Sequence, residues 1–159
     1  MGGSGDDTLI GGSGIDVIRG EDGNDSIDGG NGNDNVLGGD GDDIVFGGNG
    51  NDVIRGNGGD DTINGGLGND VVDGGADNDE LHGGFGNDII VGGLGDDDLF
   101  GDDGNDTVRG EGGNDLVRGG LGDDTLYGDE GRDEVFGDAG IDRIRGGLGE
   151  DRLLSLIHI

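Results

Sequence analysis

The sequence predicts an all-β fold, a solenoid of short parallel strands, and three observations lead to that prediction. A nine-residue pattern repeats seventeen times between residues 2 and 154, with no insertion or deletion. The chain contains 46 Gly and no Pro, and the Gly residues recur at fixed positions of the pattern. One position of the nine is always Val, Ile or Leu. Repeats of this kind become stable by stacking on their neighbours, so the whole chain is expected to form one rod.

The repeat has four nearly constant columns, counted from Gly2. Position one is Gly and position six is Asp in all seventeen repeats, position eight is always aliphatic, and position four is Gly in sixteen. Gly at positions one, two and four allows positive φ and close backbone approach, so we expect the first six residues to form a tight turn. The last three residues predict a short strand whose middle side chain faces inward.

Alternating turns and strands close into a coil. Two nine-residue repeats make one circuit, which places the strands of odd repeats in one parallel sheet and those of even repeats in a second. Each circuit rises by about one strand spacing, ~4.8 Å, so the rod is expected to be about 40 Å long. The predicted fold is thus a right-handed β-helix solenoid with two short-stranded parallel sheets that face each other across position eight.

The composition excludes several classes of function. The chain carries 38 acidic residues against 8 Arg, a net charge of −30, and it has no Cys, so disulfides and thiolate metal sites are excluded. So acidic a surface is a poor partner for nucleic acid, and no apolar run approaches the ~20 residues of a membrane span. The Gly motifs recur without a following helix pattern, which argues against a phosphate-binding loop. We find no catalytic constellation and predict that this segment is not an enzyme.

The position-six Asp residues predict a cation. In the coil they stack along each edge about 5 Å apart, where adjacent carboxylates repel by about 3 kcal/mol at an effective dielectric of 20. Repeated along both edges, this repulsion rivals the ~5–15 kcal/mol by which a domain is stable. A divalent ion in each gap between adjacent carboxylates removes this repulsion. Carboxylates and turn carbonyls are oxygen-only ligands that suit Ca²⁺ better than Mg²⁺ or Zn²⁺, and the fifteen gaps allow up to about fifteen calcium ions.

The pattern GGxGxDxUx, as in GGSGDDTLI, resembles the RTX, or haemolysin-type, calcium-binding repeat. The resemblance covers residues 2–154 and implies a parallel β-roll that folds when Ca²⁺ binds outside the cell. It also implies a secreted bacterial protein of the type I secretion class, a toxin, protease, lipase or adhesin, with neighbouring domains in a larger chain. In that family the position-six Asp and turn carbonyls bind the ion. The matching residues here are Asp7, Asp16, Asp25, Asp34, Asp43, Asp52, Asp61, Asp70, Asp79, Asp88, Asp97, Asp106, Asp115, Asp124, Asp133, Asp142 and Asp151.

A few repeats depart from the pattern. Asp77 replaces the position-four Gly, so its turn is expected to be strained, and Arg132 at position five places a cation beside Asp133. We therefore expect the sites that use Asp79 and Asp133 to be the weakest. Position two is not Gly in six repeats, where it is Glu21, Asn57, Asp102, Glu111, Asp129 and Asp138.

Position nine predicts two different outer faces. The strands of odd repeats give a more apolar outer face and those of even repeats a more basic one. Either this difference is ordinary surface variety, or the apolar face packs on a neighbouring domain. The alternative function is an adhesive or matrix module that binds a partner through its outer faces, and mutation of the three Phe residues would test it. Position three carries no regular array, which disfavours ice binding, and His82 and His158 are expected to be solvated. Odd repeats place Phe46, Phe100 and Phe136 at position nine, and even repeats place Arg19, Arg55, Arg109 and Arg145 there.

The tail LSLIHI, residues 154–159, breaks the period, the composition and the charge. A capping segment and the start of a C-terminal export signal are two interpretations. A third fits better, because the string CTG TCT CTT ATA CAC ATC encodes these six residues and resembles a transposon adapter used in sequencing libraries. We therefore expect residues 155–159 to be non-native and the chain to be an interior slice of a longer protein. The coding DNA tests this, since any other codons would contradict it.

Overall fold

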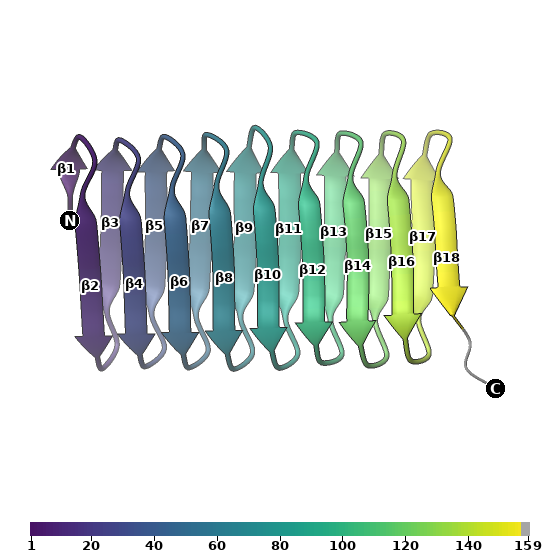
Figure 1. Cartoon of the computed structure of the whole chain (residues 1–159), viewed down its shortest axis with the longest axis horizontal. Helices are drawn as coiled ribbons and strands as arrows, with labels where there is room; N and C mark the ends of the chain where they lie inside the picture. The colour runs from purple at the N-terminus through teal and green to yellow at the C-terminus, as the bar shows by residue number, and fades with distance from the viewer. Residues whose placement is uncertain (157–159) are drawn as a thin grey trace.

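A computed structural model describes residues 1–156, and these residues form an elongated solenoid of two parallel sheets. The sheets have nine strands each, with the odd-numbered strands from β1 to β17 in one and the even-numbered strands from β2 to β18 in the other. Figure 1 shows the sheets as two stacked layers whose strands run in opposite directions, with turns along both long edges. The described residues contain no helix. The predicted all-β solenoid with two parallel sheets is confirmed.

The strands follow one another at nine-residue intervals. They are β1 (Gly3–Ser4), β2 (Thr8–Ser13), β3 (Val17–Asp22), β4 (Ser26–Asn31), β5 (Asn35–Asp40), β6 (Ile44–Asn49), β7 (Val53–Gly58), β8 (Thr62–Leu67), β9 (Val71–Ala76), β10 (Glu80–Phe85), β11 (Ile89–Leu94), β12 (Asp98–Asp103), β13 (Thr107–Gly112), β14 (Leu116–Leu121), β15 (Thr125–Glu130), β16 (Glu134–Ala139), β17 (Arg143–Leu148) and β18 (Arg152–Leu156).

The strands are longer than the sequence predicted. From β2 to β17 each has six residues, namely positions seven to nine of one repeat and one to three of the next. The predicted tight turn over the first six residues is therefore wrong, because positions one to three belong to the sheet. They pair in register with the same positions of the neighbouring coil, as in Gly84 with Gly66 and Phe85 with Leu67. Ladder pairing overrides the low strand propensity of Gly, and only positions four to six remain as a three-residue turn.

The core is a single file of aliphatic side chains between the sheets. The position-eight residues from Ile18 to Val135 are at most 6% exposed, and Leu9 and Ile144 pack against the two ends of this cluster. Each strand from β2 to β17 contributes one such side chain, since the residues on either side of it face outward. The prediction that the sheets face each other across position eight is confirmed.

The Gly columns serve two different purposes. Positions two and four have positive φ, as at Gly66 (108°) and Gly68 (134°), whereas position one does not. At position one, close approach is the reason for Gly: a Cβ on Gly65 would lie 2.6 Å from Asp70 Oδ2 and 2.6 Å from the Gly83 carbonyl oxygen. Our expectation of positive φ at position one is wrong, and the expectation of close approach is confirmed.

The residues that replace Gly at positions two and four keep a left-handed backbone. Their φ angles lie between 60° and 85°, where Asn and Asp are tolerated better than other residues and Glu is strained. The strain expected in the Asp77 turn has a basis in its φ of 76°. The seven residues are Glu21, Asn57, Asp77, Asp102, Glu111, Asp129 and Asp138.

The repeat ends at β18. Strand β18 pairs in parallel with β16, but the register shifts between Phe136 and Asp138, so that Ser155 lies opposite Asp138. The tail lacks the position-one Gly that every earlier repeat supplies at this point. Residues 157–159, including His158, lie outside the described residues, and the expectation that 155–159 are non-native remains a prediction.

Candidate metal centre

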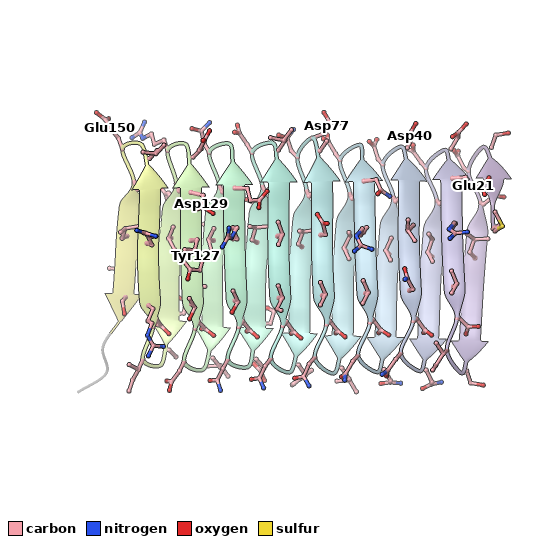
Figure 2. The ribbon with its side chains drawn as sticks, turned by 180° about the vertical axis from the view of Figure 1, so that it is seen from behind. Glu21, Asp40, Asp77, Tyr127, Asp129 and Glu150 are labelled. Carbon is pink, nitrogen blue, oxygen red and sulfur yellow. The ribbon has the colours of Figure 1, made fainter. Side chains whose placement is uncertain are left out.

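The position-six Asp residues lie at the ends of the three-residue turns, on two separate edges. Turns of odd repeats, residues 5–7 and then every eighteenth residue to 149–151, form what we call the odd edge. Turns of even repeats, residues 14–16 to 140–142, form the even edge. In Figure 1 the odd edge is the upper one and the even edge the lower one. Figure 2 shows Asp77 and Glu150 projecting from the odd edge.

Each position-six Asp is hydrogen-bonded to the next one in its column. The backbone N–H of Asp52 donates to Asp70 Oδ1 at 2.8 Å, and that of Asp70 donates to Asp88 Oδ1 at 2.8 Å. Fifteen such bonds, of 2.7–3.3 Å and all between residues 18 apart, join Asp7 to Asp151 along the two edges. The predicted stacking of carboxylates along both edges is therefore present, and one oxygen of each bonded carboxylate is satisfied.

The second carboxylate oxygen has no partner. In every position-six Asp from Asp16 to Asp142, Oδ2 is buried and makes no hydrogen bond. From Asp25 to Asp133 these residues are at most 3% exposed, whereas Asp7 and Asp151, at the two ends, are half-buried. A buried anionic oxygen without a hydrogen bond or counter-charge is strongly destabilising. Fifteen such oxygens along the two edges make a cation the fitting partner for these carboxylates.

The surroundings of Oδ2 fit a hard cation. A Cβ on Gly83 would lie 2.6 Å from Asp88 Oδ2 and 2.7 Å from the Gly101 carbonyl oxygen. A carboxylate oxygen and a carbonyl oxygen lie in the same way beside every position-one Gly from Gly2 to Gly128. The described residues offer no cluster of three or more His, Cys, Asp or Glu side chains around one point. The donor set is therefore a column of single carboxylates with backbone carbonyls. Such oxygen ligands suit Ca²⁺, and Zn²⁺ lacks its nitrogen and sulfur ligands here.

Burial raises the pKa of these carboxyl groups, because the charged form loses its water, and neighbouring carboxylates raise it further. The backbone N–H that each group accepts opposes the rise. The pKa is raised to about 7 in Asp61, Asp79, Asp106 and Asp115 and to about 6 in Asp70, and it is raised in Asp43, Asp52, Asp88, Asp97, Asp124 and Asp133.

The two sites expected to be weakest have the same local geometry as the others. Asp79 Oδ1 accepts the N–H of Asp61 at 2.8 Å, and Asp133 Oδ1 accepts the N–H of Asp115 at 3.0 Å. The Oδ2 atoms of both are buried and without a partner. Their weaker binding therefore stays a prediction, based on Asp77 and Arg132 in the same turns.

A second ladder, at position five, was missed at the sequence level. The backbone N–H of Asn69 donates to Asn51 Oδ1 at 2.8 Å, and that of Asn87 donates to Asn69 Oδ1 at 2.7 Å. These bonds run in the opposite direction to those of position six, because each side chain accepts from the residue 18 later in the chain. The signal was present in the sequence, since Asn and Asp are the side chains that can make such a bond at this position and remain solvated.

The outer faces carry the side chains predicted for position nine. The Phe residues lie on even-numbered strands and the four predicted Arg residues on odd-numbered strands. The prediction that His82 is solvated is wrong: its ring stacks on Phe100 with centroids 4.6 Å apart, and its Nδ1 lies 3.0 Å from Asp102 Oδ2. Arg118 likewise covers Phe136 at 5.5 Å. These contacts reduce the apolar surface that an adhesive function would use.

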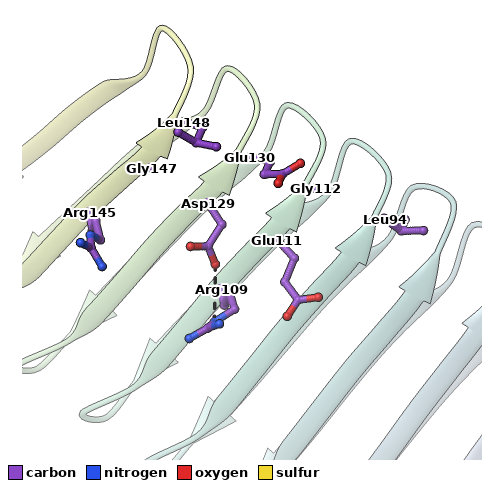
Figure 3. Close-up of a pocket in the computed structure, with 9 residues that line it drawn as sticks. All are labelled: Leu94, Arg109, Glu111, Gly112, Asp129, Glu130, Arg145, Gly147 and Leu148. Carbon is purple, nitrogen blue, oxygen red and sulfur yellow. Dashed lines mark ion pairs between the residues drawn. The ribbon is translucent and has the colours of Figure 1, made fainter.

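A shallow groove of about 690 Å³ crosses the outer face of the odd-numbered sheet (Figure 3). Its lining mixes Arg109, Asp129, Arg145 and Leu148, and Arg109 Nε lies 3.5 Å from Asp129 Oδ2. Figure 2 shows Asp129 and Tyr127 on this same face, away from the turns. The groove reaches the strand ends that precede the odd turns, at Leu94, Glu130 and Leu148, but its lining includes none of the position-six Asp residues.

Comparison with known families agrees with the geometry. Residues 1–36, 37–72, 68–99, 91–126, 100–135 and 127–155 match the RTX calcium-binding nonapeptide repeat. No curated protein matches the chain. The matched module is non-catalytic and is typical of bacterial proteins exported by type I secretion. Among the described residues, no helix has the length and apolar character needed to cross a membrane. The chain belongs to the RTX calcium-binding nonapeptide repeat family.

Proposed function

We propose that this chain binds Ca²⁺ through its position-six Asp residues and that calcium binding drives its folding. The observation that carries the proposal is the set of fifteen buried Oδ2 atoms without a partner. From Asp16 to Asp133, Oδ2 and a carbonyl oxygen of the next coil lie around the same position-one Gly, as Asp70 Oδ2 and the Gly83 carbonyl oxygen do around Gly65. All seventeen residues from Asp7 to Asp151 are proposed ligands, with up to about fifteen ions bound.

The residues of each turn have distinct roles in this proposal. The position-six carboxylate supplies negative charge, and its Oδ1 is held in place by the N–H of the preceding coil. The position-one Gly leaves the space into which Oδ2 points. The bound ion supplies the positive charge that the column lacks. Since the same carboxylates are unfavourable in the metal-free fold, calcium concentration decides whether the chain is folded.

We further propose that the chain acts outside the cell as part of a larger secreted protein. Calcium is scarce in the cytosol and abundant outside, so a calcium-dependent fold would stay open during export and form on arrival. The segment itself is proposed to have no enzymatic role. Its function would be to fold, to stiffen and to present neighbouring domains, and the type of parent protein is left open among toxins, proteases, lipases and adhesins.

Far-UV circular dichroism during a calcium titration tests the proposal, with magnesium as the control. We expect a cooperative gain of β signal with calcium alone, and calorimetry would then count the ions. Persistent coil at millimolar calcium, also after a C-terminal capping segment is added, would overturn it. The capped chain is needed because an uncapped solenoid end alone can prevent folding.

A further inference from the structure

The two edges of the solenoid carry very different charge. Apart from the position-six Asp residues, positions three to seven at each turn hold twelve acidic residues along the odd edge and two along the even edge. The odd-edge residues are Asp6, Asp22, Asp40, Asp42, Asp60, Asp77, Glu80, Asp96, Asp98, Glu130, Glu134 and Glu150, and those of the even edge are Asp103 and Asp123. Arg132 and Arg152 offset part of the odd-edge charge, and Arg143 lies on the even edge.

Position five shows that the difference is one of charge and not of geometry. On the odd edge the N–H of Asp60 donates to Asp42 Oδ1 at 3.0 Å, a contact between two acidic residues. On the even edge the matching bond, from the N–H of Asn69 to Asn51 Oδ1, is 2.8 Å long and joins two neutral residues. The even edge continues this neutral ladder through Asn33, Asn51, Asn69, Asn87 and Asn105.

The two edges are too far apart to share this charge. A six-residue strand separates them, which is about 20 Å at ~3.3 Å per residue. Exposed charges are largely screened beyond about 8 Å at physiological salt. The acidic residues of the odd edge therefore act on the ions of their own column and hardly on those of the even column.

We infer that the two calcium columns differ in affinity and that the odd edge fills first. The inference rests on the proposed function, because it assigns an order to the same sites. Both columns present the same buried, unpartnered Oδ2 atoms, so their ligands are matched. The additional carboxylates around the odd turns attract a divalent ion more strongly, and calcium affinity in oxygen sites rises with nearby negative charge. We expect the odd edge to reach half-saturation at about a tenfold lower ion concentration, which corresponds to ~1.4 kcal/mol per site.

Two tryptophan reporters can follow the edges separately, because the chain has no Trp of its own. Leu94 is the last residue of β11 and precedes an odd turn, and Phe85 is the last residue of β10 and precedes the adjacent even turn. Leu94 and Phe85 are 68% and 59% exposed, so Leu94→Trp and Phe85→Trp are matched and mild changes. Terbium, a luminescent ion with the same oxygen preference, would be titrated into each full-length variant and then displaced with calcium.

The expected result is Trp-sensitised luminescence that rises in Leu94→Trp at about a tenfold lower terbium concentration than in Phe85→Trp. Coincident midpoints would overturn the inference while leaving calcium binding in place. A signal that calcium does not displace, or no signal in either variant, would instead contradict the proposed function. The two failures are thus distinguishable.

A charge exchange tests the cause. Asp42→Asn, Asp60→Asn and Asp96→Asn together should move the midpoint of Leu94→Trp toward the even-edge value. The converse set, Asn51→Asp, Asn69→Asp and Asn87→Asp, should lower the midpoint of Phe85→Trp. Both sets keep the Oδ1 acceptor of the position-five ladder, and circular dichroism at saturating calcium verifies the fold. Midpoints that do not move with either set would show that edge charge does not order the filling.

Discussion

Positions five and six are neighbours in every turn, carry similar side chains and form ladders with the same 18-residue spacing, yet their environments differ. The position-five side chain accepts an N–H from the following coil and stays exposed, as between Asn69 and Asn87. The position-six carboxylate accepts from the preceding coil and is buried, with Oδ2 left over, as in Asp70. Position five accordingly varies between Asn, Asp and other residues, while position six is always Asp. The hydrogen bond alone therefore does not explain the constant Asp, and the need for charge does.

A fall in pH should have the largest effect on the comparison between positions five and six, because the buried position-six carboxyl groups have raised pKa values. In the folded, metal-free chain the pKa of Asp61, Asp79, Asp106 and Asp115 is about 7, above the ordinary value of 3.8. The stabilisation from their protonated forms is complete below pH ~3.8 and is lost as the pH rises through 7. In chelator, β signal should thus increase as the pH falls from 8 to 4.

With calcium present the dependence should reverse, because protons compete with the ion for the same carboxylates. The calcium midpoint, followed by circular dichroism, is expected to rise as the pH is lowered from 8 to 5.5. A midpoint that stays constant over this range would contradict the assignment of the position-six column as the ligand set.

Removal of one charge in the middle of the rod is the next largest effect. Asp70→Asn keeps the shape and the Oδ1 acceptor but leaves the neighbouring ions with one carboxylate fewer, so the calcium midpoint should rise about tenfold or more. The matched control is Asn69→Ala, one residue earlier, which removes only an exposed hydrogen bond worth about 1 kcal/mol. Equal shifts of the calcium midpoint in the two variants would contradict the distinction between positions five and six.

A methyl group tests the space beside Oδ2. A Cβ at Gly83 would lie 2.6 Å from Asp88 Oδ2, so Gly83→Ala should destabilise the calcium-bound fold by about 1–3 kcal/mol. Gly58→Ala is the control, because nothing lies within 4 Å of a Cβ there and its φ is ordinary. Thermal unfolding at saturating calcium measures both, and a Gly83→Ala chain as stable as the control would show that this space is not needed.

The smallest effect is expected for a backbone change outside positions five and six. Glu111 holds a φ of 74°, which costs a side chain about 1 kcal/mol relative to Gly, so Glu111→Gly should raise the stability by about that amount. Glu111→Gln keeps the strained backbone and removes the charge. If the Gln variant gained as much stability as the Gly variant, repulsion and not strain would be the cause.

The sequence was sufficient for the fold because its period is exact in length and its columns are chemically distinct. The two sheets, the position-eight core and the stacked Asp columns all follow from a nine-residue repeat without insertions. The turn length could not be predicted, since Gly at positions one and two is typical of turns, and only pairing with the next coil makes positions one to three part of a strand. His82 was misjudged for a different reason: the 18-residue register places it beside Phe100, but the stacking of the two rings depends on side-chain conformations that the repeat pattern does not specify.

For the site, the residue type and the position were predictable and the hydrogen-bond pattern was not. Nothing in a single turn indicates that Asp70 Oδ1 is bonded to the preceding coil while its Oδ2 is left without a partner. That distinction depends on the relative height of two coils. It is a property of the stack, and a repeat taken alone does not contain it.

The single file of aliphatic side chains has a consequence for size. In a globular domain a longer chain needs a wider core, but here each strand adds one side chain to a file of constant width, from Ile18 to Val135. Two more repeats would extend the rod by one coil and leave every other cross-section as it was. The chain can therefore gain or lose 18-residue units without a change in the packing of the core. The length of the rod can vary while its cross-section stays the same.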